Sequence, residues 1–350
     1  MQSNSSPHNN RVDIALTALA PASWGLTYLV TTELLPPGRP LLAGTLRALP
    51  AGLLLLATSR QRPVGAWWWK AAVLGTLNIG AFFALLFAAA YRLPGGVAAT
   101  LGSVQPLIAA GLATALLHER MRRQIVVAGA IGIVGVGLLV LRGNARLDPV
   151  GVVAGLAGAV SMATGVVLTK RWGRPAPLAA FTAWQLLAGG LVLAPLALAV
   201  EGAPPALSIR NALGFAWLAT GGAAVAYQLW FRGIARLPVG QVSLLGLLSP
   251  VVATLVGWTV AHQHLSAAQM LGGALVLSAL WIGQRPARGS VAQSGVVRED
   301  RELHPVGDRQ LHQQPRDVGL HGGLAHEEHV ADLRVGTPAC DLDEHVALTR

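Results

Sequence analysis

The sequence is poor in cysteine and in acidic residues. Its 350 residues include one cysteine, Cys340, so neither an intrachain disulfide nor a metal site of several thiolates is available. Only 12% of the residues are charged, about half the share of an average soluble domain. Residues 1–290 hold 20 Lys and Arg but five acids, and the cations are scattered between apolar stretches. This scatter excludes a nucleic-acid-binding surface, which gathers its basic residues on one face.

Long apolar segments take up most of the chain instead. Hydrophobic residues make up 53% of it, and a helix needs roughly 20 of them to cross a hydrocarbon layer of about 30 Å. Segments of that length occur at 14–33, 40–58, 71–90, 97–117, 124–141, 150–169, 178–199, 211–231, 239–260 and 267–284. We therefore predict an all-α integral membrane protein with ten transmembrane helices in the lipid bilayer.

The basic residues of the links predict how these helices are oriented. If the N-terminus is cytoplasmic, the inner links carry twelve Lys and Arg and the outer links carry five. We expect a multi-pass protein of the inner (plasma) membrane with both termini cytoplasmic, residues 1–12 forming the first cytoplasmic segment. Residues 287–350 lose all hydrophobic periodicity, and we interpret them as a disordered or non-native cytoplasmic tail.

An internal repeat becomes visible when the chain is shifted by 144 residues. The run that begins at Arg92 then aligns with the run that begins at Arg236, and Pro106 aligns with Pro250. Each repeat, 13–142 and 149–285, holds five helices, so the two repeats are inverted relative to each other. Inverted repeats are typical of secondary transporters, whose site lies near the midplane of the bilayer. Pro106 and Pro250 each remove a helix hydrogen bond, which either opens carbonyls toward a cavity or makes a tolerated kink.

The motifs of these repeats resemble a known family. Trp24-Gly25 in the first helix, Arg47 in the second, the two mid-helix prolines and Glu119-Arg120 after the fourth helix are similar to the EamA-type branch of the drug/metabolite transporter superfamily. The stretch from Ala20 to Pro50 is similar to the subgroup of blue-pigment (indigoidine) exporters, the PecM-like proteins. The resemblance covers roughly residues 12–286. It implies an inner-membrane exporter driven by an ion or substrate gradient.

Arg47 is the basic residue placed well inside a predicted span. A charge at such depth costs roughly 2.5–3.5 kcal/mol on insertion scales. Three interpretations stay open: Arg47 binds an anionic or carboxylate-bearing substrate, it braces the second helix against a carbonyl or Glu33, or it snorkels to the outer surface. Glu119 is expected to form an ion pair or a gate contact in a link that also carries Arg120, Arg122 and Arg123.

Other candidates are polar or aromatic residues within the spans. Trp24, Thr27 and Tyr28 either line a cavity that stacks on a planar metabolite or pack helices together. Five uncharged polar residues either touch substrate or make interhelical hydrogen bonds, which average about 0.6 kcal/mol; they are Asn78, Gln105, Gln185, Tyr227 and Gln228. Glycines of the fifth and tenth helices serve internal packing or a homodimer contact. We expect no metal site and no cofactor. A coupling ion such as the proton is possible, but no acidic residue lies at the middle of a predicted span to relay it.

These observations predict transport rather than catalysis. We expect a secondary active transporter that exports a small metabolite, pigment-like, amino-acid-derived or drug-like, by alternating access. An importer or exchanger of the same superfamily is the first alternative. An integral membrane transferase is the second, but the spans lack the catalytic carboxylate or histidine pair that it needs. Nucleotide hydrolysis is excluded because no Gly-rich phosphate loop of the Walker type occurs.

Overall fold

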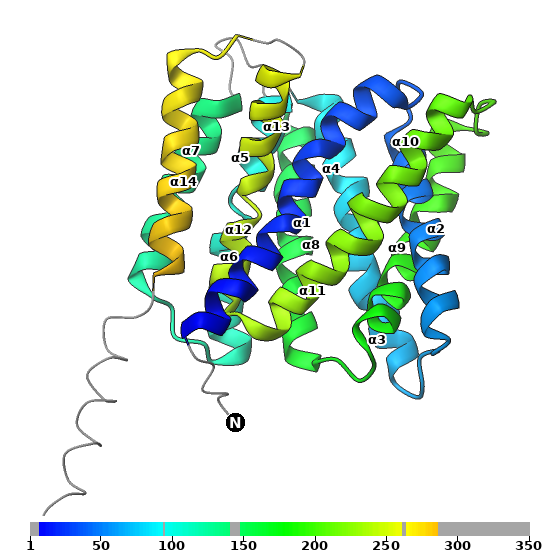
Figure 1. The fold of residues 1–350 in the computed structure, drawn as a ribbon, viewed down its shortest axis with the longest axis horizontal. Helices are drawn as coiled ribbons and strands as arrows, with labels where there is room; N and C mark the ends of the chain where they lie inside the picture. Colours follow the sequence, from blue (N-terminus) through cyan, green and yellow to red (C-terminus); the bar gives the residue numbers. More distant parts are fainter. Residues whose placement is uncertain (1–6, 94, 141–147, 261–263, 286–350) are drawn as a thin grey trace, which may run out of the picture. The chain divides into compact units, whose positions relative to one another are not determined.

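The computed structural model describes residues 7–93, 95–140, 148–260 and 264–285, and every regular element in them is helical (Figure 1). Ten spans, each formed by one helix or by consecutive helical segments, are long and apolar enough to cross a membrane. This confirms the predicted all-α membrane fold. The predicted tail, Cys340 and the first six residues lie outside the described residues.

The five spans of each half follow one another along the chain. The first half consists of α1 (Pro7–Leu34), α2 (Pro40–Ser59), α3 (Trp67–Gly75), η1 (Thr76–Gly80), α4 (Ala81–Arg92), α5 (Gly95–Gly102), α6 (Gln105–Leu117) and α7 (Arg123–Val140). The second half consists of α8 (Pro149–Trp172), α9 (Leu178–Glu201), α10 (Ile209–Ala219), η2 (Thr220–Val225), α11 (Ala226–Arg236), α12 (Val239–Leu245), α13 (Leu248–Thr259) and α14 (Ala267–Gln284).

Local sequence signals explain where several helices begin. Asp148 caps α8, its side chain accepting from Gly151 N at 2.8 Å, and proline follows at the first helical position. Ser208 and Ser266 form capping boxes with Asn211 and Gln269, three residues into α10 and α14.

The repeat extends to irregular backbone. Both η1 and η2 are single π-helical turns, and they begin at Thr76 and Thr220, 144 residues apart. The fourth and ninth spans are each broken into two short helices, α5–α6 and α12–α13. Pro106 and Pro250 lie in the first turn of α6 and α13, where a helix does not need their N–H. The prolines therefore belong to breaks between helices and not to kinks within continuous ones.

Glycines allow the helices to approach closely. A Cβ added at Gly135 in α7 would lie 2.9 Å from the carbonyl oxygen of Gly272 in α14, and one at Gly272 would lie 2.6 Å from Gly135 O. Figure 1 shows α7 and α14 side by side. A Cβ added at Gly129 in α7 would instead meet the side chain of Leu107 in α6. These glycines serve internal packing, and a homodimer contact stays a prediction.

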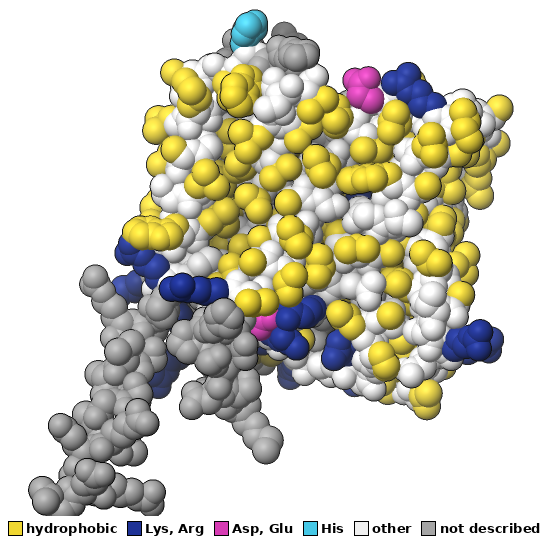
Figure 2. Space-filling model, in the orientation of Figure 1, with side chains coloured by type: hydrophobic (Ala, Val, Ile, Leu, Met, Phe, Trp, Pro, Cys, Tyr) yellow, Lys and Arg dark blue, Asp and Glu magenta, His cyan; other side chains and the backbone are white. Residues whose placement is uncertain are grey.

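The surface carries the pattern of a membrane belt. Figure 2 shows hydrophobic side chains across the visible face, and most Lys and Arg side chains along the edge at which α1 begins. We call this edge the predicted cytoplasmic face and the opposite edge the predicted outer face, following the charge count of the links.

Candidate functional site

A cavity of about 370 Å³ lies between the two halves and contains most of the predicted site residues. Its volume lies within the range of roughly 300–1,000 Å³ that small-molecule sites occupy. The lining extends to Thr31 near the end of α1 and Pro40 at the start of α2, on the predicted outer side. Seven candidates from the sequence line it: Trp24, Thr27, Arg47, Gln105, Pro106, Tyr227 and Pro250.

The two helix breaks form part of the cavity wall. Gly102 and Ser103 line it at the α5–α6 break, and Gly246 and Leu247 line it at the α12–α13 break. Backbone that is not helical is tolerated at membrane depth where it is buried in protein or lines a cavity. Both breaks thus lie at the cavity, and the opening of carbonyls toward it by the two prolines stays a prediction.

Arg47 is held by the π-helical turn of the other half. Its Nη2 donates to the carbonyl oxygen of Gly222 in η2 at 2.7 Å, and Trp24 Nε1 donates to the same oxygen at 3.2 Å. The guanidinium carbon lies 5.0 Å from the ring centroid of Phe83, and the residue is 7% exposed. The brace against a carbonyl is therefore present, whereas Glu33 pairs with Arg210 at 3.7 Å.

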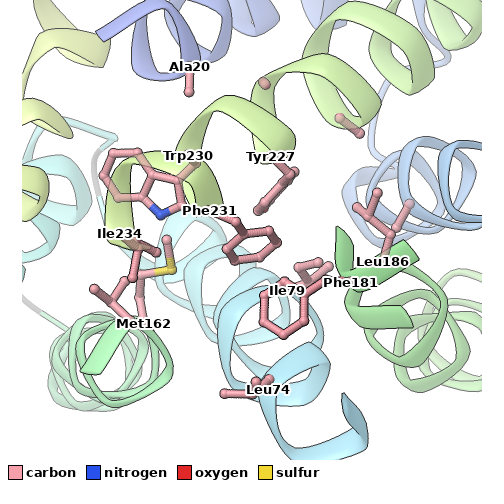
Figure 3. Packing of buried hydrophobic residues seen from close by; sticks show 14 of the residues in the cluster. Ala20, Leu74, Ile79, Met162, Phe181, Leu186, Tyr227, Trp230, Phe231 and Ile234 are labelled. Atoms are coloured by element: carbon pink, nitrogen blue, oxygen red, sulfur yellow. The ribbon is translucent and has the colours of Figure 1, made fainter. Parts of the chain in front are cut away.

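Aromatic rings surround the guanidinium. Trp24 lies 5.3 Å from Tyr227 and 5.2 Å from Trp230 between ring centroids, so this tryptophan both packs between helices and lines the cavity. Figure 3 shows Tyr227, Trp230 and Phe231 projecting from α11 below Ala20 of α1. On the other wall, Phe83 and Phe87 stack at 6.0 Å. The side chain of Tyr28 lies outside the described residues.

Three candidate amides are not among the lining residues. Asn78 Nδ2 donates to Gln185 Oε1 at 2.8 Å and to Thr169 Oγ1 at 3.2 Å. Asn78 and Gln185 are fully buried, and this network joins the two halves. Gln228 Nε2 donates to Ala224 O within its own span. Asn78 and Gln185 thus make the interhelical hydrogen bonds that were their alternative interpretation, whereas the bond of Gln228 lies within its own span.

Ion pairs join the helix ends at the predicted cytoplasmic face. Glu119 Oε1 lies 3.0 Å from Lys170 Nζ, and Glu119 Oε2 accepts from Val239 N at 3.1 Å. Lys170 also donates to Leu237 O. Glu119 thus contacts the second half. It forms the expected ion pair, but with Lys170 and not with an arginine of its own link. The two residues lie far apart in the sequence, so no local spacing could have revealed this contact.

A second ionic contact of this face joins α1 to α11. Asp13 Oδ1 lies 2.6 Å from Arg232 Nη2 and 3.1 Å from Arg236 Nη1.

Sequence reasoning also missed several lining residues, above all Phe82, Phe83, Phe87, Trp230 and Ser243. The phenylalanines within a span carry no sequence signal that separates a cavity wall from a lipid face. Ser243 did carry one, because it is a polar residue within a predicted span. Gly221-Gly222 in the middle of the eighth segment was a usable signal, because adjacent glycines there allow close contact with another helix. No cluster of three or more His, Cys, Asp or Glu that could hold a metal occurs in the described part of the chain.

Known proteins are similar to this chain in sequence and in fold. The EamA-like transporter family matches at residues 12–141 and 149–282. Protein PecM of Dickeya dadantii (strain 3937) is 48% identical over 268 residues, which cover 76% of this chain and 90% of PecM. A probable amino-acid metabolite efflux pump of Salmonella typhimurium is 26% identical over 292 residues, covering 78% of this chain and 95% of the pump.

A solved crystal structure with 22% sequence identity has a TM-score of 0.67 and covers 78% of this chain and 97% of its own, which shows a shared fold. Ten apolar spans, a cavity between two repeated halves and a family match over both halves lead to one conclusion. This chain is a multi-pass membrane transporter, not an enzyme, and it belongs to the EamA-like transporter family.

Proposed function

We propose that this transporter exports a small metabolite across the cytoplasmic membrane by alternating access, with both termini in the cytoplasm. The observation that carries the proposal is the cavity between the halves, which extends to Thr31 and Pro40 near the predicted outer face. At the predicted cytoplasmic face the Glu119–Lys170 contact joins the halves. The name of the Salmonella relative, an efflux pump, supports outward transport.

The substrate range is pigment-like, amino-acid-derived or drug-like small molecules. The aromatic wall around Arg47 suits a planar body, and the volume suits a molecule of metabolite size. A proton is our proposed coupling ion, although the described cavity lining includes no carboxylate that would relay it. A homodimer is proposed only as the assembly state to test.

Two glycines of the same span provide a matched test. Gly102 lines the cavity and Gly111 does not, and a Cβ added at either position meets no atom within 4 Å. Gly102→Phe is expected to fill the cavity and abolish efflux of a transported compound from expressing cells. Gly111→Phe should leave efflux intact at equal membrane abundance. Equal efflux by Gly102→Phe and the parent chain would refute a route through this cavity.

Direction needs a separate measurement. An importer or exchanger of the superfamily would use the same cavity, so net flux is compared in right-side-out and inverted membrane vesicles. Accumulation inside inverted vesicles, blocked by Gly102→Phe, is the result expected for an exporter. Accumulation only in right-side-out vesicles would replace export by import.

A further inference from the structure

The described lining of the cavity carries charge of one sign only, and that sign is positive. Arg47 is the one charged residue among the described residues that line it. The five acids of residues 1–290 are all engaged at the ends of spans. Their contacts are Asp13 with Arg232 and Arg236, Glu33 with Arg210, Glu119 with Lys170, Asp148 with Arg92 and Gly151 N, and Glu201 with Leu41 N and Leu42 N. A ligand in the cavity therefore meets a net positive charge.

The orientation of Arg47 is fixed before a ligand arrives. The hydrogen bond to Gly222 O and the contact with the Phe83 ring hold the guanidinium at the cavity wall. A guanidinium is planar and keeps its positive charge at every physiological pH, and its geometry matches that of a carboxylate. Since helix bracing alone needs no charge, the insertion cost of roughly 2.5–3.5 kcal/mol points to a use for the charge itself.

Three polar atoms of the described lining are left without a hydrogen-bond partner. Gln105 Nε2, Trp230 Nε1 and Ser243 Oγ are buried and have no hydrogen-bond partner among the described residues. Two of these can only donate, and the third is a hydroxyl that can do either. Trp230 is 2% exposed and Ser243 is fully buried. Figure 3 shows the ring nitrogen of Trp230 on the side of the ring toward Met162, another lining residue.

From this combination we infer that the transported molecule is a planar aromatic carboxylate, and that Arg47 is the residue that reads its negative charge. The aromatic wall takes the ring, Arg47 takes the carboxylate, and the donors take carbonyl or other acceptor atoms of the body. The same cavity disfavours aromatic amines, because a cation would meet Arg47 without a compensating carboxylate in the described lining. This inference rests on the proposed transport function and narrows its substrate class.

One aromatic scaffold with three head groups tests the inference. The probes are 2-naphthylacetate, 2-naphthylacetamide and 2-(2-naphthyl)ethylamine, and binding to the purified full chain in detergent is measured by equilibrium dialysis. Gly102→Phe serves as the reference that subtracts partition into micelles. The acid is expected to bind about 10-fold or more tightly than the amine, with the amide between them. Equal binding of acid and amine, or no acid binding above the reference, overturns the inference.

A second substitution can neutralise the positive charge of Arg47 while its hydrogen bond to Gly222 O is kept. Ala43 lines the cavity and lies one helical turn before Arg47 on α2. Ala43→Glu is expected to abolish the preference for the acid or to reverse it, whereas Ala43→Gln adds the same bulk and should keep it. An unchanged acid-to-amine ratio in Ala43→Glu would show that Arg47 does not read charge. Arg47→Lys is expected to retain the preference, and Arg47→Met to lose it.

The transport proposal and the inference about substrate recognition can be refuted independently of each other. Suppose that the acid binds preferentially, but its flux is the same in cells that express the parent chain, in cells that express Gly102→Phe and in cells that express neither. The recognition inference then stands and the transport proposal fails. If cells export the amine through the parent chain but not through Gly102→Phe, transport stands and the aromatic carboxylate is wrong.

Discussion

The contact between Glu119 and Lys170 makes a quantitative prediction about opening of the predicted cytoplasmic face. Their side chains are 28% and 23% exposed, so the ion pair itself is worth at most about 1 kcal/mol. Glu119 also accepts a charge-assisted bond from Val239 N, and such bonds exceed neutral ones by roughly 1 kcal/mol. Glu119→Gln keeps an acceptor but loses both charge effects. It should favour opening by about 1–2 kcal/mol, a shift of roughly 5- to 30-fold.

A reporter cysteine in the cavity measures this shift. Ser249 lines the cavity and is partly exposed, and replacing it by cysteine in a Cys340→Ser background leaves one thiol in the chain. A membrane-impermeant maleimide added to inverted vesicles reaches this thiol only through the predicted cytoplasmic face. Glu119→Gln should raise the labelling rate by roughly 5- to 30-fold over the parent chain.

Glu33 provides the matched control. Its contact with Arg210 is longer, at 3.7 Å, and the two side chains are 59% and 63% exposed at the predicted outer face. Glu33→Gln should therefore leave the labelling rate unchanged. The exchange Glu119→Lys with Lys170→Glu should recover part of the parent rate, because the pair is restored with reversed polarity. Unchanged labelling in Glu119→Gln, or an equal rise in Glu33→Gln, would refute a gate at this contact.

Three further predictions concern stability in detergent, measured as the midpoint of thermal unfolding. Gly135→Leu should lower this midpoint, because the new Cβ would lie 2.9 Å from Gly272 O and such overpacking costs about 1–3 kcal/mol of unfolding free energy. Gly111→Leu places its side chain in open space and should leave the midpoint unchanged. Asn78→Leu should cost about 1–2 kcal/mol by leaving Gln185 and Thr169 without their shared donor, and an unchanged midpoint would show that this network is not needed. Ser266→Ala should cost about 1 kcal/mol through loss of the α14 cap, with Ser278→Ala, on the exposed surface of the same helix, as its comparison.

The sequence was most informative where hydrophobic length decides the structure. Each of the ten predicted segments corresponds to one span. The largest difference is at 211–231, where the span continues to Arg236. Hydrophobicity ends before the helix does there, because Arg232 and Arg236 extend the helix and pair with Asp13. The third span likewise begins at Trp67 instead of 71, since interfacial tryptophans are compatible with a helix.

Side-chain partners across the membrane region could not be predicted in the same way. No residue pattern pairs Arg47 with the carbonyl of Gly222, because a backbone acceptor has no residue-type signature. Nor does composition reveal the π-helical turns, which depend on how the spans pack. The repeat alignment did pair Pro106 with Pro250, but it predicted two prolines within continuous helices, and the structure places them just after a break in each span.

The two halves share backbone contacts but differ in chemistry. Ser23 Oγ donates to Gly221 O and Ser161 Oγ to Leu77 O, so each half binds the π-helical turn of the other through an equivalent serine. Arg47 and Gln185 each lie 24 residues after these serines. Arg47 lines the cavity, whereas Gln185 is buried with the amide of Asn78.

This difference bears on how one fold can both move and discriminate. Alternating access needs the two halves to have matching backbone geometry, so that one arrangement can convert into its inverse. Recognition needs the opposite, since a symmetric pair of charges would place a second cation beside the substrate. A charged residue, Arg47, in the first half and a neutral, fully buried one, Gln185, at the corresponding place in the second half satisfy both requirements. Changes at Gln185 should therefore alter stability and the conformational equilibrium, while changes at Arg47 alter which molecules are bound.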